Sequence, residues 1–251
     1  MTLSDGLSDD AVRDALVAEN ARLAELVATA DHATPVPTCP GWDLTKLLRH
    51  VGRGHRWAAT MVATRATEVL DPREVPGGKP PADLDGIVAW LRASARAVPD
   101  AVDATGPEVP VWTFTGPKPA AWWIRRRLHE ETAHLADAQL ALGREVDLAP
   151  ELGADGLSEW LDLLAARPAE MLPADVTLHL HATDVDGEWT IRPTDTGIAW
   201  EPGHAKGTAA VRGPAALLYL ALLRRVPLAD PRLAVFGEEK AVSAFLDATP
   251  F

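Results

Sequence analysis

The spacing of apolar residues changes once along the chain, near residue 175, and this change limits the possible folds more than any other feature of the sequence. Before it, apolar side chains recur every three or four residues, which is the spacing of amphipathic helices. After it, residues 176–181 alternate apolar and polar side chains, which is the spacing of a strand. The sequence therefore predicts an α+β protein, with a helical region followed by a smaller region built around a sheet.

Four segments of the first region have the length and the apolar stripe of bundle helices. They cover residues 8–30, 44–68, 83–98 and 120–143, and residues 99–119 are expected to be irregular. Asp43 is placed to cap the second segment, because its carboxylate can accept hydrogen bonds from free backbone N–H groups. Four helices of this length are typical of a four-helix bundle, which we expect in residues 1–148.

Residues 149–251 are expected to form a small α/β domain. A helix over residues 154–167 leads into it, and the pair Asp186-Gly187 signals a hairpin between the first strand and the returning strand EWTIRP. Further short strands are predicted in GIAWEPG, TAAVRG and RLAVFG, with helices in PAALLYLALLRR and EEKAVSAFLDA. This order of elements predicts an antiparallel or mixed sheet with helices packed against it.

Charge and composition exclude several classes of partner. The chain has 24 Lys and Arg against 36 Asp and Glu, a net charge of -12, which disfavours binding to nucleic acid. No apolar run reaches the roughly 18–20 residues of a membrane span, and the acidic start of the chain does not resemble a signal peptide. We therefore expect a cytoplasmic protein. Cys39 is the only cysteine, which excludes an internal disulfide and any metal site made of several cysteines.

A polar stretch in the fourth helical segment holds candidate metal ligands. His129, Glu130 and His134 almost match the H-E-x-x-H motif of zinc proteases, but with one residue too many. His129 and His134 are five apart, so they lie roughly 140° apart around a helix and are badly placed to bind one ion. Glu130 and His134 are four apart and share a face. The pair is either part of a metal site or an ordinary ion pair on a solvated helix.

The second helical segment offers a third ligand. Its expected inward seam runs Leu47, His50, Gly54, Trp57 and Met61, at the spacing of a bundle helix. His50 is either a packing histidine or a ligand that faces Glu130 and His134 across the bundle. Two imidazoles and one carboxylate are the ligands of an open catalytic zinc site, and bundle interiors recurrently hold such sites.

Neighbouring residues allow two interpretations each. His55 is expected at the surface, and Asp137 either orients an imidazole or lies exposed. The run Arg125-Arg126-Arg127 is a solvated helix face or an anion clamp, and Arg127 in particular either binds a carboxylate or pairs with Glu130. Trp123 either lines a pocket or packs in the core, and Trp112 and Phe114 are candidates for a lid.

Two further side-chain groups are weaker candidates. Cys39 precedes a helix, where a thiol can become reactive, but it also lies in a Pro-rich turn that gives it a structural role. His179 and His181 share one face of a predicted strand, so they form either a chelating pair or a hydrated surface.

Two stretches, PTCPGWDLTKLLRHVGRGHRW and WWIRRRLHEETAHLADAQLALG, resemble the mycothiol-dependent maleylpyruvate isomerase family. The later stretch LHLHATDVDGEWTI and the apolar helix with its following strand resemble the C-terminal domain of that family. The resemblance covers nearly the whole chain. It implies a DinB-like four-helix bundle followed by a domain similar to sterol carrier proteins.

The resemblance also implies ligands and a cofactor. It places a divalent metal ion, most often zinc, on His50, Glu130 and His134, and a cofactor-facing arginine on Arg225 or the adjacent Arg224. Arg127 and Trp123 would complete the catalytic and cofactor-binding groups.

The implied reaction is the addition of a metal-bound thiolate of mycothiol to a conjugated double bond, followed by rotation and elimination. A mycothiol S-transferase and a non-catalytic, metal-stabilised binding protein are the alternatives. A small-molecule substrate is expected in each case, and the sequence leaves the oligomeric state open.

Overall fold

The computed structural model describes residues 7–169 and 171–250, and these residues form two units. Residues Ser8–Asp147 make up one unit, and the chain from Leu148 onward makes up nearly all of the other. The first unit is helical and the second contains a mixed sheet, so the predicted α+β class is confirmed. Among the described residues, no helix is both long enough and apolar enough to cross a membrane.

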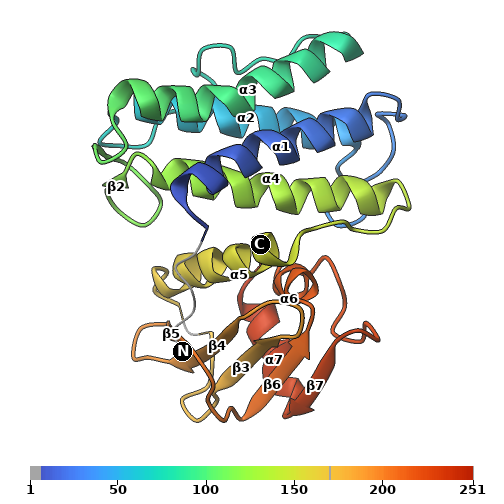
Figure 1. The fold of residues 1–251 in the computed structure, drawn as a ribbon, viewed down its shortest axis with the longest axis vertical. Coiled ribbons are helices and arrows are strands. Elements are labelled where there is room, and N and C mark those ends of the chain that lie inside the picture. The colour runs from blue at the N-terminus through green and yellow to red at the C-terminus, as the bar shows by residue number, and fades with distance from the viewer. Residues whose placement is uncertain (1–6, 170, 251) are drawn as a thin grey trace. The chain divides into compact units, whose positions relative to one another are not determined.

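The first unit is a four-helix bundle, drawn from blue to yellow-green in Figure 1. Its helices are α1 (Asp9–Val27), α2 (Leu44–Ala63), α3 (Leu84–Thr105) and α4 (Trp122–Ala141), with two short strands, β1 (Pro110–Val111) and β2 (Lys118–Pro119), between α3 and α4. Helix α2 packs mainly on α3, and α1 packs mainly on α4. Burial of leucine and valine side chains between these helices is the main source of their stability.

The start of α2 agrees with the expected cap. Asp43 has an extended backbone, and its Oδ1 accepts a hydrogen bond of 2.7 Å from the backbone N–H of Lys46. This contact satisfies one of the N–H groups that the first turn of a helix leaves without an intrahelical partner.

Helix α3 is longer than expected, because it continues through Pro99 to Thr105. Proline removes one backbone donor and disfavours the helix interior. Here Leu91, Ala95, Val98 and Val102 form one fully buried stripe on both sides of the proline. Packing of this stripe outweighs the local cost, so the expected irregular stretch begins only at Gly106, whose φ of 101° ends the helix.

The second unit contains a five-stranded sheet with the order β5-β4-β3-β6-β7. The strands are β3 (Leu178–Ala182), β4 (Glu188–Pro193), β5 (Ile198–Pro202), β6 (Ala209–Gly213) and β7 (Ala234–Gly237), and the helices are α5 (Pro150–Ala165), α6 (Ala215–Leu222) and α7 (Glu239–Ala248). Only the β3–β6 pair is parallel. The sheet is therefore mixed, which is one of the two arrangements that the sequence predicts.

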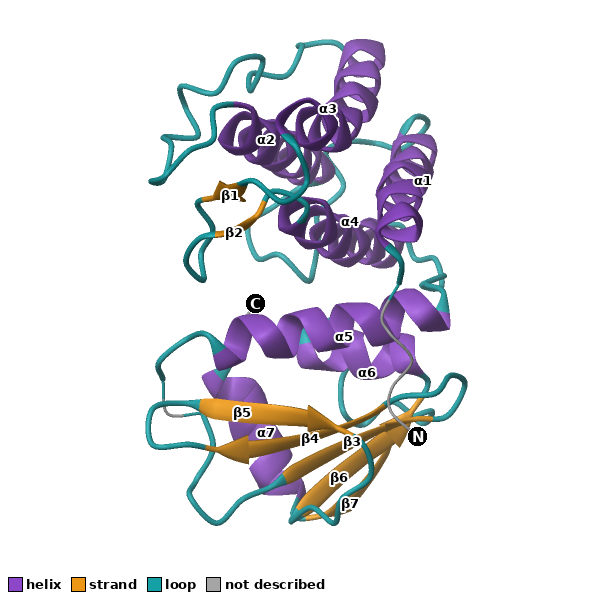
Figure 2. Ribbon diagram, turned by 60° about the vertical axis from the view of Figure 1, so that its left-hand side comes forward, coloured by secondary structure: helices purple, strands orange, loops and turns teal. Residues whose placement is uncertain are grey.

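One face of the sheet carries mainly apolar side chains and the other carries mainly polar ones. Leu180 lies opposite Trp189, and the indole N–H of Trp189 donates to Ser158 Oγ of α5, so this face packs against helices. His181 lies opposite Glu188, so both side chains point to the other face, because side chains alternate along a strand. Figure 2 shows the sheet together with α5, α6 and α7.

Candidate metal centre

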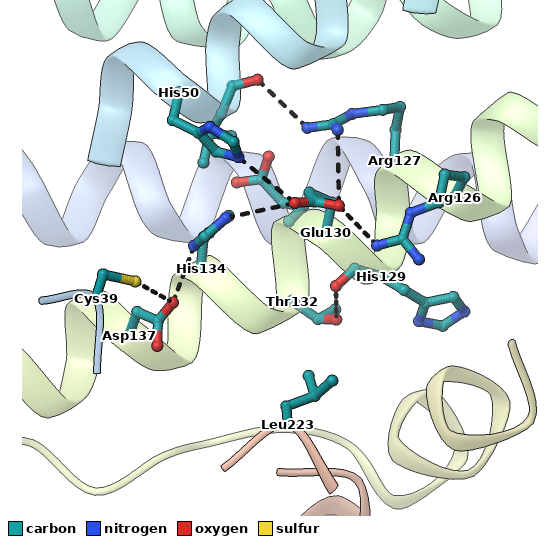
Figure 3. Close-up of polar contacts among 12 residues, drawn as sticks. Cys39, His50, Arg126, Arg127, His129, Glu130, Thr132, His134, Asp137 and Leu223 are labelled. Carbon is teal, nitrogen blue, oxygen red and sulfur yellow. Dashed lines mark hydrogen bonds and ion pairs between the residues drawn. The ribbon is translucent and has the colours of Figure 1, made fainter. Parts of the chain in front are cut away.

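Three potential metal ligands from two helices of the bundle face one another. His50 lies on α2, and Glu130 and His134 lie one turn apart on α4 (Figure 3). The Nε2 atoms of both histidines lie 3.5 Å from Glu130 Oε1, and the two imidazole centroids are 4.9 Å apart. All three ligand atoms lie within 4.8 Å of one another. The structure therefore brings together the three residues that the sequence singled out.

The seam expected for α2 is correct at its ends, where Leu47 and Met61 are fully buried, and is displaced by one position between them. The buried face of this helix includes Val51, His55, Ala58 and Val62, whereas the His50 side chain is 44% exposed. The expectation that His55 lies at the surface is wrong, because its side chain is fully buried. His50 instead lies at the edge of the seam, where it combines contact with α4 and access from solvent.

Glu130 has a different partner for each carboxylate oxygen. Oε1 faces the two histidines, whereas Oε2 accepts a hydrogen bond of 2.7 Å from Arg126 Nη2. Burial raises the pKa of Glu130, but the charges of Arg126 and Arg127 and the histidine contacts outweigh it and hold the pKa well below its usual range. The group is thus a carboxylate with one oxygen held by arginine and the other directed at the histidines.

His134 is oriented by Asp137. Its Nδ1 donates a hydrogen bond of 2.9 Å to Asp137 Oδ2, which directs Nε2 toward Glu130. Burial lowers the pKa of His134, but the hydrogen bonds to Asp137 and Cys39 and the charge of Glu130 more than compensate and raise it well above its ordinary value. Of the two interpretations of Asp137, the orienting one is therefore confirmed, since its side chain is fully buried.

Cys39 is close to the same histidine. Its thiol donates to Asp137 Oδ2 at 3.4 Å, and Cys39, His134 and Asp137 form a second set of ligand atoms within 4.8 Å. Both sets use His134, so they are alternatives for one ion. Of these two sets, the one made of His50, Glu130 and His134 adjoins a cavity, which His50 and Glu130 line. It is therefore the better candidate for a reactive centre.

A buried polar network lies behind the centre. Arg127 Nε donates to His55 Nδ1 at 3.2 Å, and His55 Nε2 is 2.5 Å from Glu131 Oε2, which also accepts from the Asn20 amide at 3.1 Å. Burial, followed by the charge of Arg127, lowers the pKa of His55. Because His55 Nδ1 accepts from Arg127, the proton of this neutral imidazole lies on Nε2, and the network as a whole links α1 and α2 to the helix that carries Glu130.

A cavity of about 670 Å³ adjoins the three ligands. His50 and Glu130 form part of its lining, and its cationic groups are Lys46, Arg49, Arg53 and Arg127. Arg127 is buried, so the interpretation of this arginine as part of a solvated face is wrong. Gly54 leaves room for it, because a Cβ atom at this position would lie 2.7 Å from Arg127 Nη2.

The far wall of the cavity is aromatic. Trp57 and Phe114 line it, with ring centroids 5.7 Å apart. Trp123 is fully buried behind them, 5.4 Å from the Trp57 ring, and its indole N–H donates to the Trp112 carbonyl. Trp123 thus supports the wall, and its role toward a cofactor stays a prediction.

Arg224 and Arg225 belong to the second unit, directly after α6. Arg224 has a positive φ of 60°, and its Nη2 contacts the Leu246 carbonyl and Asp247 near the end of α7. Arg225 is half-buried and donates to the Leu223 carbonyl at 2.7 Å. Both arginines therefore have partners within the second unit, and a role of either in binding a cofactor stays a prediction.

Comparison with known proteins shows the family. A family model described as the mycothiol maleylpyruvate isomerase N-terminal domain matches residues 13–139, and the MDMPI C-terminal domain matches residues 151–244. The fold is similar to the crystal structure of the mycothiol-dependent maleylpyruvate isomerase, with a TM-score of 0.61 and 16% identity over 94% of each chain. A histidine-to-alanine mutant of that isomerase gives a TM-score of 0.63 with 14% identity, again over 94% of each chain.

These identities are low, so the likeness to the solved structures shows the fold alone. No curated protein matches the sequence. The two family models, however, cover most of the chain, from the first helix of the bundle to the last helix of the second unit. The chain belongs to the mycothiol maleylpyruvate isomerase family.

Proposed function

We propose that this chain is a metal-dependent enzyme that uses mycothiol to convert a cis double bond of a small anionic substrate, such as maleylpyruvate, into the trans form. The observation that carries the proposal is the position of His50, Glu130 and His134 at the edge of a cavity rich in cationic groups. Membership of the family supports mycothiol as the thiol and isomerisation as the reaction.

The three ligands fit a zinc ion. Bonds of 2.0–2.2 Å from zinc to nitrogen and oxygen place the ligands of a tetrahedral site roughly 3.3 Å apart. Both histidine nitrogens already lie 3.5 Å from Glu130 Oε1, so little movement is needed. His50, Glu130 and His134 would hold the ion with one position left open, and the ion would supply the positive charge that lowers the pKa of a thiol bound there.

Neighbouring groups hold these ligands in place. Asp137 fixes the tautomer and the ring orientation of His134, which is a common arrangement around metal-binding histidines. Arg126 holds Glu130 Oε2 and leaves Oε1 for the ion. We infer that both act as positioning residues, because each forms a hydrogen bond to a proposed ligand side chain and so acts on the ion through it.

The cationic groups of the cavity account for an anionic substrate. Lys46, Arg49 and Arg53 follow one another at intervals of three and four residues along one face of α2. Arginine binds carboxylates through paired hydrogen bonds, so Arg49, Arg53 and Arg127 suit a substrate with a carboxylate at each end. Arg225 is the group proposed to bind the thiol cofactor.

The proposed reaction restores the thiolate that starts it. The sulfur forms a bond to one carbon of the conjugated double bond, and the displaced electron pair moves onto the neighbouring carbonyl oxygen. The resulting C–C single bond rotates, the electron pair returns, and the C–S bond breaks to give the trans double bond. The arginines around the cavity would stabilise the charge that develops on oxygen.

The first test is the metal content of the full chain by elemental mass spectrometry. We expect each of the variants His50→Ala, Glu130→Ala and His134→Ala to contain one zinc ion fewer per chain than the wild type. His32→Ala is the matched control, since His32 lies in the same unit and its imidazole Nε2 bonds to the Val27 carbonyl at the end of α1. A folded wild-type chain that binds no metal, even after zinc is added, would contradict the proposal.

The second test follows the reaction. Maleylpyruvate is incubated with the zinc-loaded chain and mycothiol, and substrate, product and thiol are measured. We expect trans product without loss of thiol, and no product from the three ligand variants. Equal loss of thiol and substrate would support the S-transferase instead, and metal binding with no turnover would support a binding protein.

A further inference from the structure

The sheet of the second unit carries a cluster of imidazoles that the proposed reaction does not use. His179 and His181 lie on β3, and Glu188 lies directly opposite His181 on β4. His204 follows β5 in the loop that returns toward β6. These four side chains gather on the face of the sheet opposite the one that packs against α5.

All three histidines turn a ring nitrogen toward the same carboxylate. His179 Nε2 and His204 Nδ1 lie 2.9 and 2.8 Å from Glu188 Oε2, and His181 Nδ1 lies 3.4 Å from Oε1. The rings of His179 and His204 are 5.1 Å apart. One ligand atom each from His179, Glu188 and His204 lies within 4.8 Å of the others.

The cluster has a buried base and an open mouth. The His179 side chain is only 6% exposed, whereas His204 is 76% exposed. A dissolved ion can therefore reach the ligands from the side of His204, and His179 supplies a fixed ligand at the bottom. The sequence allowed His179 and His181 to be part of a hydrated surface. The burial of His179 does not agree with that interpretation.

The loop that supplies His204 is tied to the sheet at both ends. The backbone N–H of Gly203 donates to the Glu188 carbonyl at 3.0 Å, and Thr190 Oγ1 donates to the Gly203 carbonyl at 3.2 Å. A Cβ atom on Gly207 would lie 2.6 Å from the Ala209 carbonyl oxygen, so the far end of the loop also lies against the strands. These contacts place His204 over Glu188 before any ion binds.

We propose that His179, Glu188 and His204, with His181 beside them, form a second site for a divalent transition-metal ion. Imidazole nitrogen suits zinc, copper and nickel, and a set of three imidazoles with one carboxylate does not suit magnesium or calcium. To admit an ion with bonds of 2.0–2.2 Å, the nitrogen and oxygen ligands need to separate by roughly 0.5 Å from their present contacts. The ion would take the place of the hydrogen-bond protons between the imidazoles and Glu188. It would link the loop that carries His204 to β3 and β4.

The test uses the full chain with His50→Ala and His134→Ala, so that the bundle no longer competes for metal. Zinc is titrated into this protein in a calorimeter. We expect one ion per chain, and no binding after His204→Ala or Glu188→Gln is added. Glu201→Gln is the matched control, because Glu201 lies on the neighbouring strand β5 and forms an ion pair with Arg192. The control should keep the ion.

A second comparison covers the case in which the combined variants do not fold. The otherwise unchanged chain should bind two zinc ions, and the single variant His204→Ala should bind one. Because the His204 side chain is exposed, the fold should survive its replacement by alanine. The second site would be overturned if His204→Ala left zinc binding unaltered. It would also be overturned if the chain with His50→Ala and His134→Ala bound no zinc. Neither result bears on the bundle site, whose own variants test it separately.

Discussion

Asp137 is not one of the three proposed metal ligands, but it acts directly on one of them, His134. It accepts the Nδ1 hydrogen bond of His134 and is fully buried. Asp137→Asn keeps the shape but removes the charge that fixes the histidine tautomer. We expect zinc affinity to fall by about 10- to 100-fold, the usual effect of losing such a partner. Competition with a coloured chelator measures it.

The control for this change is Asp100→Asn, an exposed carboxylate on α3. It should leave zinc affinity unchanged. If Asp137→Asn binds zinc as tightly as the wild type, then Asp137 does not orient His134 in solution, and the ion is held without it.

His50, Glu130 and His134 could be predicted from spacing and from the family resemblance, but the role of His55 could not. The buried face of α2 is wider than the expected seam, since it includes Leu47 and Met61 of that seam as well as Val51 and Val62 beside it. Gly54 and Trp57 were assigned to the buried seam because they are apolar, but they line a cavity rather than the core. The burial of His55 depends on Arg127 and Glu131, which lie more than seventy residues away.

His55→Leu tests that buried network. The change removes the His55 hydrogen bond from the fully buried Glu131 carboxylate, which then accepts from the Asn20 amide. Leaving a buried polar group without its hydrogen-bond partner typically costs about 1–3 kcal/mol of stability, and more when that group is charged. We expect a loss of this size in the free energy of unfolding, measured with urea.

The double variant His55→Leu/Glu131→Leu provides the comparison, because it removes the stranded carboxylate as well. It should recover a large part of the loss. A single variant that costs under about 1 kcal/mol would mean that the network contributes no more than an ordinary hydrogen bond.

At the scale of elements, the cap of α2 controls the helix that carries His50. Asp43 makes a short hydrogen bond to the first turn, and His50 lies two turns later. Asp43→Ala should lower the stability of the bundle by about 1 kcal/mol, the usual value of an N-cap. Thermal unfolding followed by circular dichroism measures this, and Asp43→Asn should stay close to the wild type because asparagine caps equally well. Equal losses in both variants would contradict a capping role.

Local patterns predicted most elements and missed those that depend on distant contacts. The four bundle helices and the five strands were expected near their observed positions, since their periods are clear in the sequence. The continuation of α3 past Pro99 was not, because it depends on burial of Val98 and Val102 by other helices. The parallel pairing of β3 with β6 was likewise left open, because strand partners are chosen by the whole sheet rather than by a local period.

At the scale of the whole molecule, we propose that the two units are separate domains, residues 1–148 and 149–251. An apolar core cluster among the described residues runs from Leu23 to Leu142 and lies entirely within the first unit. The proposed metal ligands and all the residues that line the adjoining cavity also belong to this unit. A domain with its own core and its own site has what it needs to fold and to bind metal alone.

A chain that ends after residue 148 tests this division. We expect it to unfold in one cooperative transition and to bind one zinc ion with an affinity close to that of the full chain, because all three ligands and Asp137 are retained. Circular dichroism and calorimetric titration measure the two properties. His134→Ala in the same shortened chain should keep the transition and lose the ion. A broad, non-cooperative transition would show that the bundle depends on the second unit for its fold. Cooperative unfolding without zinc binding would instead show that residues after 148 complete the metal centre.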